Sequence, residues 1–310
     1  MVANKTEPPI TKNYLTIVAL EDGLTAKLSV NACEYCVDGD GVWRTLPANS
    51  LTENINAGQT LSFRGNLTPT SSVGVGTFYV TKSFKLKGTP MSLLFGDDGK
   101  SNFSLKGKSH AFYKLFEGCS NLISASEFNL SALILDIHSY SYMFYLCTNL
   151  IHSPLLPAKN LAEYCYNGMF KGCKKITDIY YLELPAISLP NFVYVSMFED
   201  CISLTNTPKL PATELSTACY QQMFKNCTGL TSAPELPATK LTAACYRNMF
   251  NGCSKLNYIK MMATDISGSN CLYDWVSGIA SSGTFVKNKN ANWSVVGTSG
   301  IPEGWTVITE

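Results

Sequence analysis

Apolar residues recur at a fixed spacing through the larger part of the chain, from residue 111 to about residue 280. A Phe is followed by a Cys three residues later and by Leu or Ile six residues later. The Phe residues of this pattern are Phe116, Phe144, Phe170, Phe198, Phe224 and Phe250. Successive copies are 26 or 28 residues apart. A fixed period of this size predicts an array of stacked repeats, with about six full copies and one degenerate copy.

Within a copy, apolar residues follow one another at intervals of four. The segment LAEYCYNGMFKGC shows this spacing at Leu161, Cys165, Met169 and Cys173. On a helix these residues fall within one half of the circumference, so the segment is predicted to be an amphipathic helix. The segment that follows carries two prolines, such as Pro234 and Pro237, and is predicted to be extended.

Before the repeats, residues 13–90 change to short alternating runs such as YLTIVAL and LTAKLSV, separated by turn sequences. These runs predict strands of a small antiparallel β-sandwich. Residues 1–12 are predicted to be an extended arm, and residues 91–110 a hinge that docks on the first repeat. Residues 281–310 are predicted to cap the last repeat.

One helix and one extended segment per repeat is the arrangement of leucine-rich repeats. The expected fold class is therefore α+β. An N-terminal antiparallel β-sandwich precedes a right-handed α/β leucine-rich-repeat solenoid over residues 111–280, which ends in the C-terminal cap.

The balance of charges argues against a nucleic-acid partner. The 310 residues contain 24 basic and 23 acidic side chains, a net charge of +1, which provides no field to attract nucleic acid. No run approaches the roughly 18 apolar residues that a membrane helix needs. The start, MVANKTEPPI, lacks the basic and apolar regions of an export signal. We expect neither a nucleic-acid partner nor a membrane span.

Twelve cysteines are the most conspicuous candidates for chemistry, but the repeat pattern accounts for ten of them. On the expected helices they are too far apart for disulfides, so free buried thiols are predicted. Cys33 and Cys36 lack a second pair of metal ligands, and the following DGDG predicts a tight turn. The three histidines lie in no catalytic motif. We expect no catalytic residue, cofactor or metal, although an enzyme based on carboxylates alone stays an alternative.

Binding is the remaining class of function. In the extended segments, the residue at the x of Pro-x-Leu-Pro, or at the equivalent point of the irregular copy, differs from copy to copy: Leu155, Glu183, Lys209 and Glu235. These residues are predicted to line one face of the array and to contact a partner. The alternative is that they only cover the surface. Exposed tyrosines such as Tyr164, Tyr180 and Tyr181 are further candidates, for stacking on sugars.

The combination MFxxCxxL…PxLPAxxL…CYxxMF, with each element in fixed phase, resembles the BspA-like leucine-rich repeats of Bacteroides and related bacteria. The resemblance covers roughly residues 111–280. It implies a non-enzymatic recognition or adhesion protein, displayed extracellularly or at the cell surface, that binds protein or glycan through the repeats. The ligand itself is unspecified.

An alternative comes from a different class of protein. A cysteine-rich interior without disulfides fits assembly in a reducing cytoplasm. In this alternative, the chain is a structural or host-attachment protein of a bacteriophage particle, associated with its tail or capsid.

Overall fold

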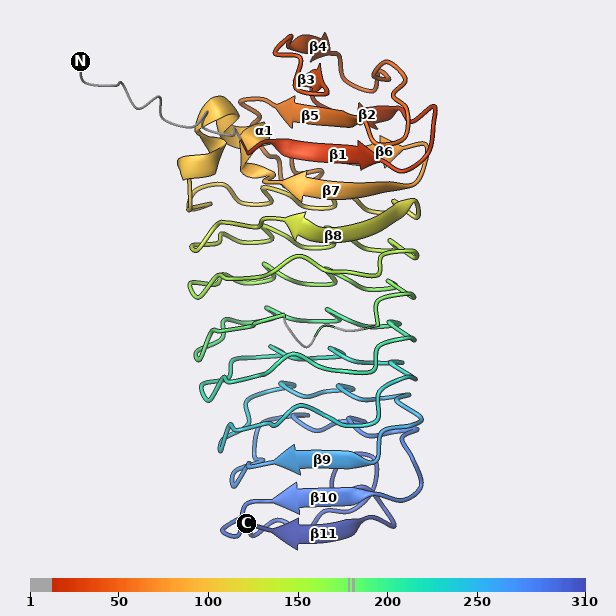
Figure 1. Cartoon of the computed structure of the whole chain (residues 1–310). Helices are drawn as coiled ribbons and strands as arrows, with labels where there is room; N and C mark the ends of the chain where they lie inside the picture. The colour runs from red at the N-terminus through yellow and green to blue at the C-terminus, as the bar shows by residue number, and fades with distance from the viewer. Residues whose placement is uncertain (1–12, 178, 180–181) are drawn as a thin grey trace, which may run out of the picture.

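A computed structural model describes residues 13–177, 179 and 182–310 (Figure 1). The chain forms an N-terminal sheet, a long stack of repeats, and a small sheet at the far end. We call each repeat of 26 or 28 residues a coil. The expected N-terminal arm, residues 1–12, lies outside the described residues.

The N-terminal strands follow the alternating pattern of their sequences, because inward residues such as Leu15 and Ile17 are fully buried. The strands are β1 (Leu15–Ala19), β2 (Ala26–Leu28), β3 (Cys33–Val37), β4 (Arg44–Leu46), β5 (Thr60–Arg64), β6 (Phe78–Val80) and β7 (Phe84–Gly88). β2 and β6 form a two-stranded ribbon. The others form a sheet of order β4-β3-β5-β1-β7-β8, whose pairs are antiparallel up to β7.

The last strand of this sheet belongs to the first coil. β8 (Leu122–Phe128) pairs with β7 in parallel, so the sheet continues directly into the stack. Along the chain, β7 and β8 are separated by the short helix α1 (Met91–Phe95) and the 3-10 helix η1 (Gly96–Ser101). Ser92 of α1 is buried; its Oγ accepts from the Leu15 N–H and donates to the Phe63 carbonyl. This ties α1 to two strands of the sheet.

The helices predicted in the repeats are wrong. Residues 161–173 form a run of turns, as do the equivalent residues of the other coils. Every fourth residue of a run has a left-handed backbone, for example His138, Tyr142 and Leu146, with φ of 57°, 55° and 60°. An α-helix requires negative φ throughout, so it cannot form here.

Hydrogen bonds explain why the turns replace a helix. Within a coil, the Met143 N–H donates to the Tyr140 carbonyl at 3.2 Å, which closes a turn. The neighbouring Phe144 N–H donates instead to the Met169 carbonyl of the next coil, at 2.9 Å. Alternate N–H groups therefore bond within a coil and between coils. Stacking satisfies the donors that a helix would satisfy internally.

The interior is built from stacked rings. The repeated Phe residues stack almost face to face, as Phe144 does on Phe170, with ring centroids 5.6 Å apart and planes at 4°. A second stack begins at Phe112 and consists of Tyr140, Tyr166, Tyr194, Tyr220 and Tyr246. Of the positions predicted to face inward, Cys165, Met169 and Cys173 are buried and Leu161 is partly buried, although the backbone that carries them is not helical.

The stack ends in a parallel sheet of β9 (Tyr258–Met261), β10 (Thr284–Lys287) and β11 (Thr306–Thr309). Trp275 takes the place of the repeated aromatic rings and contacts both Tyr246 and Phe250. Its indole N–H donates to the Gly300 carbonyl at 2.8 Å. The indole of Trp305 donates likewise to Ala280, at 2.9 Å. Residues 281–310 thus lie over the last aromatic layer.

The expected fold class, an α+β protein with a β-sandwich and a right-handed α/β leucine-rich-repeat solenoid, is wrong. The described chain consists of sheet and turns, and its one α-helix is the five-residue α1. None of the described helices has the length and apolar character required to cross a bilayer.

Candidate functional site

The four predicted binding residues lie at equivalent points of successive coils. Leu155, Glu183, Lys209 and Glu235 are all exposed, and Leu155 retains 61% of its surface. Each is followed by a leucine whose side chain is buried: Leu156, Leu184, Leu210 and Leu236. This alternation is that of an extended segment with one face in the core. The four side chains therefore form one outward-facing column.

Ion pairs are found towards the two ends of this column. At its N-terminal end, Lys87 of β7 pairs with Glu127 of β8 at 3.0 Å. Towards the other end, Lys260 contacts both Glu235, at 3.4 Å, and Glu310, at 2.8 Å. Lys209 makes no ion pair with any described residue. It is the cation of this column that stays available to a partner.

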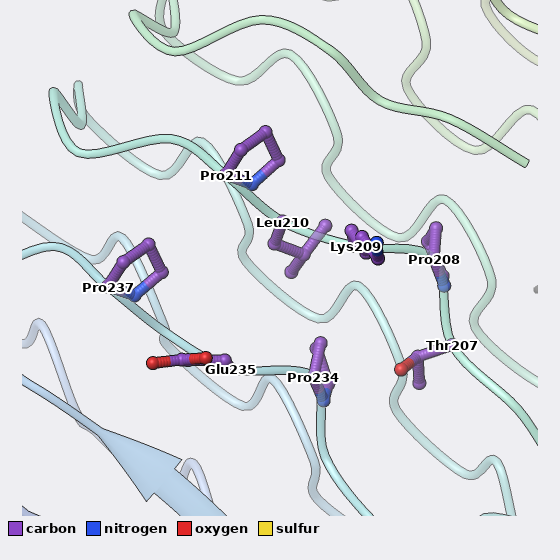
Figure 2. A pocket seen from close by; sticks show the side chains of 8 residues that line it. All are labelled: Thr207, Pro208, Lys209, Leu210, Pro211, Pro234, Glu235 and Pro237. Carbon is purple, nitrogen blue, oxygen red and sulfur yellow. The ribbon is translucent and has the colours of Figure 1, made fainter.

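The structure brings Lys209 and Glu235 to the same surface pocket, of about 450 Å³ (Figure 2). Leu155 and Glu183 do not line it. The lining comes from the extended segments of two neighbouring coils and is mainly apolar: Thr207, Pro208, Lys209, Leu210, Pro211, Pro234, Glu235 and Pro237. Figure 2 shows two proline rings on each segment, with the two charged residues between them. A pocket of this size is in the usual range for ligand sites.

Proline explains why the pocket lies between these two coils. Four of the lining residues have no main-chain N–H, so they cannot complete a ladder of hydrogen bonds. Among described residues, no main-chain bond joins segments 207–211 and 233–237. The second segment is bonded on its other side, where Ala233 donates to Tyr258 and Leu236 to Lys260. Among described residues, segment 233–237 is thus hydrogen-bonded to the following coil and not to segment 207–211 of the preceding one.

The cysteines are buried and free, which confirms the prediction of buried thiols. The thiol of Cys173, for example, donates to the Phe144 carbonyl of the preceding coil at 3.1 Å. Burial raises the pKa of Cys165 to about 12. Such thiols are protonated at neutral pH and are poor nucleophiles.

The DGDG segment forms the predicted turn between β3 and β4. Asp40 accepts hydrogen bonds from the Arg44 guanidinium and the Val42 N–H, which lower the pKa of Asp40 to about 2. The thiol of Cys36 donates to the same carboxylate at 3.2 Å. In the described part of the chain, no three His, Cys, Asp or Glu side chains are placed to hold a metal ion.

A row of rings crosses the first coils on the side of the turns. His110, His138, Tyr164 and Phe192 stack in this order, with centroids 4.5 to 4.7 Å apart. Tyr164 has a neighbouring ring on each face, so it cannot stack on a sugar as predicted. The other two candidates, Tyr180 and Tyr181, lie outside the described residues.

Sequence reasoning missed the proline-lined pocket as a unit. It identified the exposed Lys209 and Glu235 but not the gap between their segments. The signal was present, because Pro-Lys-Leu-Pro and Pro-Glu-Leu-Pro occur in consecutive copies.

Comparisons of the chain with protein-family models, curated proteins and solved structures gave no match. The resemblance to BspA-like repeats therefore stays a prediction.

Proposed function

We propose that the protein is a non-enzymatic recognition protein that binds a macromolecular partner through the column Leu155, Glu183, Lys209 and Glu235 and the pocket within it. One observation carries this proposal. The residues that recur in the coils are buried in the core, whereas the four residues of the column differ from coil to coil and are exposed at equivalent points. A rigid scaffold that presents variable side chains is typical of repeat proteins that bind partners.

The chemistry of the remaining groups supports binding over catalysis. Burial raises the pKa of the coil thiols, as for Cys245, whose pKa is about 12. His110 and His138 contact each other and nearby serines, and neither lies at the pocket. The pocket itself carries one cation and one carboxylate, which suit recognition by charge.

We further propose display outside the cell or at its surface, as the BspA-like resemblance implies, with host protein or glycan as partners. The test uses the intact chain on arrays of extracellular-matrix proteins and glycans. A variant with Leu155→Ser, Glu183→Gln, Lys209→Met and Glu235→Gln should lose binding to whichever ligand the native chain captures.

A matched control changes similar exposed residues that lie off the column: Ile187→Ser, Glu214→Gln and Lys240→Met. This control should bind as the native chain does. The proposal is contradicted if no arrayed ligand is captured, or if the column variant binds unchanged.

A further inference from the structure

We propose that the pocket between residues 207–211 and 234–237 binds an extended peptide segment of a partner protein, with an acidic side chain of that segment on Lys209. This inference rests on the proposed function and names the partner class for the same site. Three features of the pocket lead to it: its unbonded main-chain groups, its free cation and the absence of aromatic rings from its lining.

Main-chain groups beside the pocket are open to an added strand. The N–H and carbonyl groups of Lys209 and Glu235 make no hydrogen bond with any described residue. Both residues are exposed and lie on extended segments. An extended peptide offers N–H and carbonyl groups at matching intervals, which is the basis of recognition by strand addition. The prolines leave these groups without a partner in the adjacent coil, so the groups stay available to a peptide that lies over the pocket.

The charged residues of the pocket, Lys209 and Glu235, differ in whether they already have an ion-pair partner. Glu235 lies 3.4 Å from Lys260, which also pairs with Glu310 at 2.8 Å. Lys209 makes no ion pair with either Glu183 or Glu235, the residues at the same position of the adjacent coils. Lys209 is therefore the charged residue of the lining with which an acidic group of a ligand can pair. A carboxylate can accept from the Lys209 ammonium in a charge-assisted hydrogen bond.

The lining favours a peptide over a glycan. Sugar-binding sites commonly place an aromatic ring against the apolar face of the sugar, and none of the pocket residues is aromatic. Proline and leucine instead provide aliphatic surface for the side chains next to the acidic residue, such as valine or leucine. The expected ligand is thus a peptide with one acidic residue flanked by aliphatic ones.

The experiment is calorimetric titration of the intact chain with capped heptapeptides. One peptide carries a central glutamate among valine, threonine and serine, and its partners carry glutamine or lysine at that point. The glutamate peptide should bind best. Lys209→Met should weaken it about fivefold, the range of an exposed ion pair. Lys209→Glu should reverse the order, so that the lysine peptide binds best, and Lys209→Arg should keep the native order.

Lys240→Met is the control, since Lys240 is an exposed lysine outside the pocket. It should leave every peptide affinity unchanged. The inference is overturned if the glutamate and glutamine peptides bind the native chain equally, if neither binds, or if charge reversal at Lys209 does not reverse the order. It is also overturned if glycans bind at the pocket and compete with the peptide. Failure of the peptides while the arrays still capture a ligand through the column would reject this inference alone and leave the proposed function intact.

Discussion

The thiol of Cys227 donates a hydrogen bond to the main-chain carbonyl of Phe198, one coil earlier, with 3.1 Å between sulfur and oxygen. The same oxygen accepts the N–H of Cys201 within its own coil, also at 3.1 Å. Each cysteine of this position therefore links its coil to the one before, except that Cys119 of the first coil donates to Phe78 of β6. The equivalent thiols are Cys119, Cys147, Cys173, Cys201 and Cys253.

Replacing this thiol tests the link between coils. Cys227→Ala removes the donor and leaves a space of about one methyl group, so unfolding should become easier by about 1–2 kcal/mol. Cys227→Val fills the space without a donor and should cost less than Cys227→Ala. Urea denaturation of the two variants separates the contributions. Equal midpoints for the native chain and Cys227→Ala would show that the thiol contributes nothing.

The central ring of the Phe stack should be the costliest single residue to truncate. Phe224 is fully buried, with ring centroids 5.6 Å from Phe198 and 5.8 Å from Phe250. Phe224→Ala should lower the free energy of unfolding by about 3–5 kcal/mol. Phe192→Ala, in the half-buried outer row, should cost clearly less. A melting curve unaffected by Phe224→Ala would refute the assignment of this ring to the core.

A single glycine distinguishes the turn backbone from a helix. Ala244 has a left-handed backbone, with φ of 53°, and its side chain is half-buried. In a helix Ala→Gly costs about 1 kcal/mol, whereas at positive φ it relieves strain of about the same size. Ala244→Gly should therefore leave the melting temperature unchanged or raise it. A fall of several degrees is the result expected of a helix and would contradict the turns.

The stacked histidines should make stability depend on pH. Burial lowers the pKa of His138, and the charge of His110 lowers it further. Burial also lowers the pKa of His110, partly opposed by Asp136. The unfolded chain, with histidine pKa values of about 6.5, takes up more protons than the folded chain as pH falls. This contribution to stability is therefore complete above that pH and is lost below it.

Melting temperatures between pH 8 and pH 5 measure this effect. His138→Phe continues the row towards Phe192 with an uncharged ring, so it should reduce the pH dependence. His152→Gln changes an exposed histidine on the extended side of the coils and should leave the slope as it is. An identical slope for His138→Phe and the native chain would exclude the histidine pair as its source.

The helix prediction failed for a specific reason. Residues four apart lie on one face both in a helix and in a run of four-residue turns, so burial of Cys165, Met169 and Cys173 fits either. Over a helix, however, that face drifts by about 40° with each step of four. The strict spacing of Cys-Tyr, Met-Phe and Cys already indicated a period of four. The residue types at the left-handed positions did not predict a positive φ, since His138, Tyr142 and Leu146 occupy them in one coil.

Part of the candidate site was likewise predictable from the sequence, and part was not. Alternation in Pro-Lys-Leu-Pro was enough to predict that Lys209 is exposed and that Leu210 is not. The pocket depends on which main-chain groups of two segments, 26 residues apart in sequence, fail to bond. That relationship has no local signature, because it arises only when the coils are stacked.

The sequence by itself determined the length of each coil, its buried residues and its exposed variable positions, since a period and a pattern of hydrophobicity are local properties. The tertiary structure decided the backbone of the repeats and the place of the pocket. A left-handed residue at every fourth position is unfavourable in an isolated segment. It becomes stable here because alternate N–H groups, such as those of Tyr140 and Phe144, bond to the next coil.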